Sequence, residues 1–269
     1  MRFSPLIGPI GEMRAVSTAG GGTALTSAAT FLQLLPGAEA VQVVARNYAT
    51  AVAVQAALCP WLTILKTTDS FAAATNTTDY SDAAQDASTG TDVVLSSLAT
   101  SGAVWVGSHI PFRGVSIDVD AANGNAATVA ATYWTTGATM ASLTVTDGTA
   151  SGGATFAVDG TITWTVPTDW QAAPLATVAG IAAGVQIPQK AEALYWVKFT
   201  MNAALDSSTT QNSWIAMNRS TAYYELIAEA PEIALAVRRG SGGHAAVELK
   251  TDAGTANAVV NVLTGGRFV

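Results

Sequence analysis

Alternating apolar and polar positions predict a series of short β-strands within residues 112–201. Val115, Ile117 and Val119 alternate with polar residues, which is the period of two expected of a strand with one buried face. The same alternation recurs at 131–134, 162–166 and 195–201. Because no clear amphipathic helix separates these segments, the sequence predicts an all-β fold built on an antiparallel β-sandwich rather than βαβ units.

Two connections stand out within this predicted sandwich. Asp159-Gly160 lies between residues 156–158 and the alternating residues 162–166, and it predicts a hairpin because both turn residues tolerate positive φ. Residues 170–189 form a longer connection that contains two prolines and two glycines. A loop of that length is uncommon in a compact fold, so we expect it to make contacts or to contain a short element.

The two ends of the chain also read as β-structure. Val41, Val43 and Ala45 form one alternating set, and residues 51–58 fit either a helix or a strand, with their spacing favouring a strand. Four more strands are predicted after residue 207, at 224–227, 233–239, 245–249 and 258–263. Since a meander of three or four strands is marginal alone, we expect residues 31–70 and 207–269 to pair into a second, smaller β-domain, with the sandwich of residues 79–206 inserted between them. Strand exchange with another subunit is the alternative.

Residues 1–30 are rich in Gly, Ser, Thr and Ala and include Gly20-Gly21-Gly22. They fit either a flexible arm or an extended arm that orders by lying over a neighbouring subunit, and the second interpretation suits an assembly protein better. The triple glycine is not a phosphate loop, because no Lys-Ser or Lys-Thr follows it.

Residues 79–206, about half of the chain, carry a characteristic succession of aromatic residues, glycines and turn residues. The segments concerned are Asp79-Tyr80-Ser81-Asp82, Val104-Trp105-Val106-Gly107, Pro111-Phe112-Arg113-Gly114, Tyr133-Trp134, Asp147-Gly148-Thr149, Gly160-Thr161-Ile162-Thr163-Trp164, Pro167-Thr168-Asp169-Trp170 and Tyr195-Trp196-Val197-Lys198. This order resembles a β-sandwich module of the virion structural proteins of tailed bacteriophages. The chain departs from that pattern at Met140, where a Trp is usual.

The resemblance implies a jelly-roll-like sandwich that acts through subunit contacts and is not an enzyme. We expect a structural component of a tailed-phage virion, with capsid decoration favoured over a neck, tail or baseplate position. Its partners would be other virion proteins, either major capsid or tail proteins, and further copies of itself. A host-surface glycan-binding module of a tail or head fibre is the alternative. The family supplies no active site and no cofactor to carry over to this chain.

Composition agrees with an assembly role. Charged residues make up 12% of the chain, against about 25% in typical globular domains, and a free monomeric enzyme normally needs more surface charge for solubility. The net charge is −7 and no basic stripe is present, which disfavours nucleic-acid binding. The longest apolar run, residues 51–65, contains Gln55 and Pro60 and is too short to span a bilayer. We expect no membrane contact, and a protein made in the host cytoplasm and located in the virion.

Few residues suggest chemistry. Cys59, the single cysteine, stands in an apolar setting that predicts a buried, inert thiol. Ser108 and His109 are adjacent, but neighbouring strand residues face opposite sides and no nucleophile elbow surrounds the serine. His244 falls in a glycine-rich hairpin tip. We expect both histidines to be ordinary polar residues.

Four aspartates are plausible metal ligands. Asp118 and Asp120 share one face of a predicted strand, and Asp147 and Asp159 lie in predicted turns. A solvated outer face is the favoured interpretation, and a calcium site without EF-hand spacing is the minor one. We therefore expect no metal and no cofactor.

The aromatic pairs Tyr133-Trp134 and Tyr195-Trp196 each place one member on either side of a strand. Most such residues fill cores or cover a sheet face against another element. Those that face outward are candidates for a subunit interface or a sugar-stacking platform, and the candidate contact residues are Trp134, Trp170 and Trp196.

Overall fold

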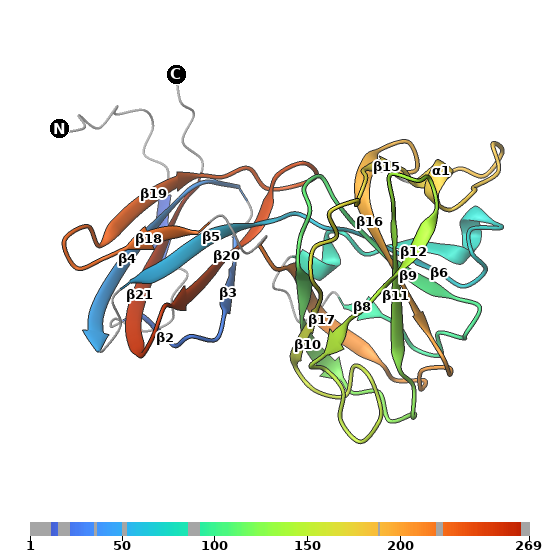
Figure 1. Cartoon of the computed structure of the whole chain (residues 1–269), viewed down its shortest axis with the longest axis horizontal. Helices are drawn as coiled ribbons and strands as arrows, with labels where there is room; N and C mark the ends of the chain where they lie inside the picture. The colour runs from blue at the N-terminus through green and yellow to red at the C-terminus, as the bar shows by residue number, and fades with distance from the viewer. Residues whose placement is uncertain are drawn as a thin grey trace. The chain divides into compact units, whose positions relative to one another are not determined.

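The computed structural model of the chain describes residues 12–15, 22–34, 37–49, 53–85, 92–187, 189–218 and 223–264 (Figure 1). The chain is all-β, and the strand pairings described are antiparallel, which confirms the predicted fold class. It divides into two compact units: unit 1 comprises Met1–Leu58 and Thr221–Val269, and unit 2 comprises Cys59–Ser220.

Unit 1 contains two sheets to which both ends of the chain contribute. Sheet A has the strand order β1-β21-β4-β19, with β2 also paired to β21. Its strands are β1 (Glu12–Ala15), β2 (Thr23–Leu25), β4 (Ala38–Ala49), β19 (Glu232–Ala236) and β21 (Thr255–Thr264). Sheet B has the order β18-β5-β20-β3. Its strands are β3 (Thr30–Gln33), β5 (Val54–Pro60), β18 (Tyr224–Leu226) and β20 (His244–Thr251).

The core of unit 1 depends on pairing between the first and last parts of the chain. The long strands β4 and β21 pair from Thr255 opposite Ala49 to Thr264 opposite Ala38, and Figure 1 shows blue and red strands interleaved in both sheets. The predicted set Val41, Val43 and Ala45 is buried in a cluster with apolar residues of β5, β20 and β21. This confirms a second β-domain made from the N- and C-terminal segments, but with narrower bounds than predicted, because residues 59–70 and 207–220 belong to unit 2. Within residues 51–58, β5 begins at Val54 and is a strand, as favoured.

The predicted N-terminal arm differs from expectation where the structure describes it. Glu12–Ala15 and Thr23–Leu25 pair with β21 of the same chain rather than extending away from it. Gly22 has a φ of +85°, and a Cβ there would lie 2.5 Å from the carbonyl oxygen of Ala258. A glycine therefore lets the backbone approach β21 closely. The rest of the predicted arm, residues 1–11 and 16–21, lies outside the described residues.

Unit 2 contains two sheets packed on each other. Sheet C has the order β12-β11-β16-β9-β6-β7, and sheet D has the order β13-β14-β10-β17-β8. The strands of sheet C are β6 (Thr63–Thr67), β7 (Thr77–Asp79), β9 (Ala103–Ser108), β11 (Val129–Trp134), β12 (Met140–Leu143) and β16 (Ala193–Met201). Those of sheet D are β8 (Val93–Val94), β10 (Gly114–Ala121), β13 (Thr146–Asp147), β14 (Gly160–Thr163) and β17 (Thr210–Ala216). The short elements are η1 (Ala74–Asn76), η2 (Ala83–Gln85), β15 (Ala173–Pro174) and α1 (Leu175–Val178).

The inner faces of these two sheets form the sandwich core predicted from the alternating residues. Val115 and Ile117 of β10 are buried in one cluster with Val197 and Phe199 of β16. Trp214 of β17 lies at the centre, with ring centroids 5.6 Å from Phe156 and 6.0 Å from Phe199. Sandwich-like packing of antiparallel sheets is thus the basis of this unit.

The predicted hairpin at Asp159-Gly160 is wrong. Residues 156–158 are not a strand, and Phe156 has a φ of +57°. The backbone bends there over Thr149, whose hydroxyl accepts the N–H of Phe156 and whose carbonyl oxygen accepts that of Ala157. This bend buries Phe156 completely. Strand β14 then pairs with β10 and β13 instead of with the residues just before it.

The long connection after Trp170 covers the second face of sheet C. Leu175 and Val178 of α1, together with Ile187, are buried in a cluster with Trp105, Trp134 and Trp196 of sheet C. The connection therefore does make contacts and does contain short elements, β15 and α1. The central strands β9, β11 and β16 of sheet C consequently carry buried residues on both faces, which explains why aromatic residues occupy consecutive positions of β11 and β16.

A glycine makes room for the central indole of this covered face. Trp196 lies directly opposite Gly107 of β9, and a Cβ on Gly107 would lie 2.6 Å from Cζ3 of Trp196. Trp196 cannot retreat, because its Nε1–H donates to the carbonyl oxygen of Ala173 at 3.0 Å and its side chain is fully buried.

We therefore expect Gly107→Ala to lower the free energy of unfolding by about 1–3 kcal/mol, the usual effect of overpacking a rigid core. Denaturant unfolding followed by tryptophan fluorescence measures the change. Gly184→Ala is the matched control, since a Cβ there would meet nothing within 4 Å. Equal stability of the two variants would show that Trp196 is free to move.

Candidate functional site

The three tryptophans predicted as contact residues lie in the interior of unit 2. Their relative solvent exposures are 9% for Trp134, 6% for Trp170 and 0% for Trp196. The Nε1–H of Trp170 donates to the carbonyl oxygen of Trp196 at 3.3 Å, which fixes that indole further. These residues therefore pack the domain and offer no open ring face to a sugar or a partner, because the connection after Trp170 covers the side of the sheet that had been expected to face outward.

A cluster of aromatic rings joins the sandwich core to this covering connection. Trp170 packs against Phe112 at a centroid distance of 5.3 Å, against Tyr195 at 5.6 Å and against Tyr133 at 6.3 Å. Phe112 also contacts Trp164 at 5.3 Å. Tilted and edge-on ring pairs of this kind stabilise a core beyond the area that they bury. Tyr133 and Tyr195, the first members of the two adjacent pairs, are only half-buried.

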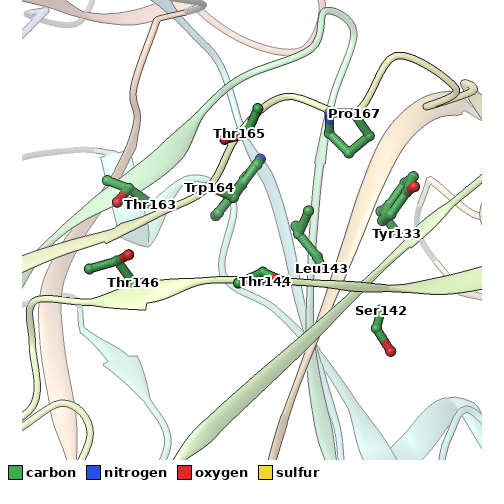
Figure 2. Close-up of a pocket in the computed structure, with 9 residues that line it drawn as sticks. All are labelled: Tyr133, Ser142, Leu143, Thr144, Thr146, Thr163, Trp164, Thr165 and Pro167. Atoms are coloured by element: carbon green, nitrogen blue, oxygen red, sulfur yellow. The ribbon is translucent and has the colours of Figure 1, made fainter.

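An open groove lies beside this aromatic cluster, wholly within unit 2. Its volume is about 590 Å³, and it is lined by Tyr133, Ser142, Leu143, Thr144, Thr146, Thr163, Trp164, Thr165 and Pro167. Two segments form its sides, residues 142–146 and residues 163–167 (Figure 2). The chain passes from sheet C to sheet D in the first of them, because β12 ends at Leu143 and β13 begins at Thr146.

Two buried apolar side chains lie at the bottom of the groove. Leu143 and Trp164 belong to the sandwich core and are 8% and 6% exposed. The Nε1–H of Trp164 donates to the carbonyl oxygen of Phe112 at 3.0 Å, so the indole is held in place. The bottom of the groove is therefore rigid and apolar.

Hydroxyl groups form the rest of the lining. Ser142, Thr144, Thr146 and Thr165 are exposed, and Thr163 is half-buried. Among the described residues, none of these five hydroxyls forms a hydrogen bond with another group of the protein. Threonines elsewhere differ: the hydroxyl of Thr149 donates to Asp147, and that of Thr210 to Asp120. The groove hydroxyls are thus available to a ligand as donors and acceptors.

Tyr133 lies at one end of the groove and is held by a neighbouring carboxylate. Its hydroxyl donates to Oδ1 of Asp169 at 2.9 Å. This hydrogen bond raises the pKa of Tyr133 above its ordinary value, with smaller contributions from burial and from the negative charge of Asp169. The phenol therefore stays protonated and fixed in orientation at neutral pH.

Ser108 and His109 do not form a catalytic pair. The hydroxyl of Ser108 accepts the N–H of Ile110 at 3.3 Å, and Nδ1 of His109 is buried with no hydrogen-bond partner among the described residues. Burial lowers the pKa of His109, while the charge of Glu192 opposes that change. His244 begins β20, in the other unit, where its Nδ1 accepts the N–H of Arg238 at 3.5 Å. An acid, base and nucleophile in contact, as a triad requires, are not found at these positions.

The structure brings three of the four candidate aspartates together. The pKa of Asp118 is raised, first by burial and also by the nearby carboxylates of Asp159 and Asp120, although a hydrogen bond from Asn212 opposes the shift. Asp159 accepts the N–H of Val119 at 2.9 Å. The fourth, Asp147, accepts both the N–H and the hydroxyl of Thr149, in an Asx turn.

No group of three or more His, Cys, Asp or Glu side chains among the described residues is arranged to hold a metal ion. Cys59 is buried, as its apolar setting predicted. Across the described ranges, no helix has both the length and the hydropathy needed to cross a bilayer.

The groove was not predicted from the sequence, although a signal for it was present. Threonines recur at every second position in Thr144-Val145-Thr146 and in Thr161-Ile162-Thr163-Trp164-Thr165, so each segment carries a row of hydroxyls on one face. That the two rows meet depends on the crossover of the chain between the sheets. The alternation itself does not specify this crossover.

Comparison of the chain with protein-family models, curated proteins and solved structures finds no match. The class that the fold defines is an all-β protein with several antiparallel sheets packed as sandwiches.

The raised pKa of Asp118 gives a testable effect on stability. A carboxyl whose pKa is higher in the folded than in the unfolded state favours folding when protonated, and this contribution is lost as the pH rises through the folded pKa. We therefore expect Asp118→Asn to raise the melting temperature at pH 7, with the gain disappearing below the ordinary pKa of 3.8. Asp82→Asn, at an exposed position, is the control. A lower melting temperature for Asp118→Asn at pH 7 would contradict this account.

Proposed function

We propose that this chain is a non-enzymatic structural component of a tailed-phage virion that acts through contacts with other subunits. Decoration of the capsid surface is the favoured position, ahead of the neck, tail or baseplate. The resemblance of residues 79–206 to a virion β-sandwich module motivates the proposal, and the low fraction of charged residues, 12%, supports it.

The observation that carries the proposal is the set of sheet edges in unit 1. Strands β19, β18 and β3 each pair on one side only within the described chain. On β18, Tyr224 is 51% exposed, the largest exposure among the large apolar residues that the structure describes, and Ile227 just after the strand is 37% exposed. Unpaired edges offer backbone donors and acceptors to another chain, and an apolar edge adds contact area.

Weak contacts of this kind suit a symmetric lattice. A single short edge strand supplies little binding energy, but many copies held on one particle bind through multivalency. A protein that works this way needs stable domains and repeated adhesive surfaces, and it has no need of a reactive cleft. The all-β architecture of both units and the absence of a triad at Ser108 or His244 are compatible with that role.

The direct test is the location of the protein. Purified particles that carry a tagged copy, imaged by electron microscopy with a label against the tag, are expected to show the label at regular sites on the head. Labelling confined to the neck or tail would change the position proposed within the particle. Absence of the protein from purified virions would end the proposal.

A substitution on the exposed edge tests the mechanism. Tyr224→Lys places a charge on β18, and a charged side chain on an edge strand discourages pairing with another chain. We expect fewer copies per particle and less self-association by light scattering, with an unchanged melting temperature.

The matched control is Val158→Lys, since Val158 is similarly exposed, at 43%, but lies in a bend of unit 2 rather than on an edge strand. Equal incorporation of both variants would show that subunit contacts do not use β18.

A further inference from the structure

We propose that the groove beside Tyr133 in unit 2 is a binding site for a short, neutral saccharide. This activity goes beyond the structural role. The site does not include Trp134, Trp170 or Trp196, which are buried. The groove combines a rigid apolar bottom, formed by Leu143 and Trp164, with sides that carry hydroxyl groups. A sugar ring presents the complementary surface, because it has apolar C–H faces and an edge of hydroxyl groups.

The charge of the lining selects against ionic ligands. None of the nine lining residues carries a charged side chain, and the chain as a whole has a net charge of −7. A phosphate, a sialic acid or a nucleic acid normally needs Arg, Lys or a metal ion in its site. The groove offers none of these. Its five Ser and Thr hydroxyls lack hydrogen-bond partners among the described residues, so they can both donate to and accept from neutral hydroxyl groups.

The shape of the groove indicates a short ligand that enters from one end. Thr146 pairs with Thr163 in the ladder between β13 and β14, which joins the two sides at that end. Figure 2 shows Tyr133 and Pro167 toward the opposite end, away from this pairing. The volume of about 590 Å³ lies within the range of about 300–1,000 Å³ typical of small-molecule sites. A terminal unit of a glycan fits this arrangement better than a long polymer that passes through.

An extended peptide is the other class of occupant, and the strands here are too short for it. Peptides that add to a sheet edge bind through a run of main-chain hydrogen bonds. In the groove, β12 ends at Leu143 and β13 has only two residues, Thr146–Asp147. Thr144 and Thr165 belong to no ladder. Side-chain hydroxyls, rather than a continuous free edge, therefore dominate what the groove presents.

The experiment is a binding screen of the full chain against immobilised neutral oligosaccharides of hexoses and N-acetylhexosamines, with sialylated and sulfated glycans alongside. Calorimetric titration with the best neutral oligosaccharide then measures the affinity. We expect saturable binding that prefers neutral glycans. Thr144→Val and Thr165→Val each remove one hydroxyl while keeping a β-branched side chain, and each is expected to weaken binding by about two- to tenfold.

Thr168→Val is the matched control, because Thr168 is an exposed threonine three residues beyond Thr165 that does not line the groove. Its affinity should equal that of the unchanged protein, and all three variants should keep the same melting temperature. The proposal is overturned by no saturable binding to any neutral glycan, by preference for charged glycans, or by affinity unchanged in Thr144→Val and Thr165→Val. Failure here leaves incorporation into particles unaffected, so it is distinguishable from failure of the structural role.

Discussion

Burial of both faces of the central strands of sheet C is the constraint on which the rest of unit 2 depends. A sheet with one apolar face can leave the other in water, but β9, β11 and β16 carry large apolar residues on both faces. The second face must therefore be covered, and the connection after Trp170 does so with Leu175, Val178 and Ile187. The close fit of Trp196 over Gly107 shows how little space this arrangement leaves. Without the cover, three tryptophans would be exposed to water.

This constraint also decides which surfaces remain available for function. Aromatic residues suggest a sugar platform or an interface when the sequence is read strand by strand, because one member of each adjacent pair must face away from the sandwich core. The covering connection removes that surface and leaves accessible the place where the chain crosses between the sheets. There the buried Leu143 and Trp164 of the apolar core line the bottom of the groove, and threonines form its sides. The candidate site is therefore a consequence of the crossover rather than of the aromatic residues on their own.

The sequence predicted the parts of the fold that depend on local alternation. Val41, Val43 and Ala45 were placed correctly on a buried face, and so were Val115 and Ile117, because period-two patterns report directly on strand faces. The prediction of a hairpin at Asp159-Gly160 was wrong because the backbone N–H of Phe156 donates to the hydroxyl of Thr149 and bends the chain. Local propensity does not encode this contact. Trp134 and Trp196 do pack against another element, which was the favoured interpretation, but the sequence did not show which segment covers them, because that segment is distant from β11 in sequence. The groove was missed because two threonine rows meet only in three dimensions.

The same reasoning explains why the two units suggest different kinds of interaction. In unit 1 the first and last parts of the chain pair through β4 and β21. The remaining edge strands present unpaired backbone groups, and one of them carries the exposed Tyr224. Such edges are complementary to other protein chains, including further copies of this one. In unit 2 the accessible feature is a concave, uncharged surface of hydroxyls over an apolar bottom, which is complementary to a small polar molecule. A chain with few charged residues can thus bind other subunits through one unit and a neutral ligand through the other, because neither interaction depends on charged side chains.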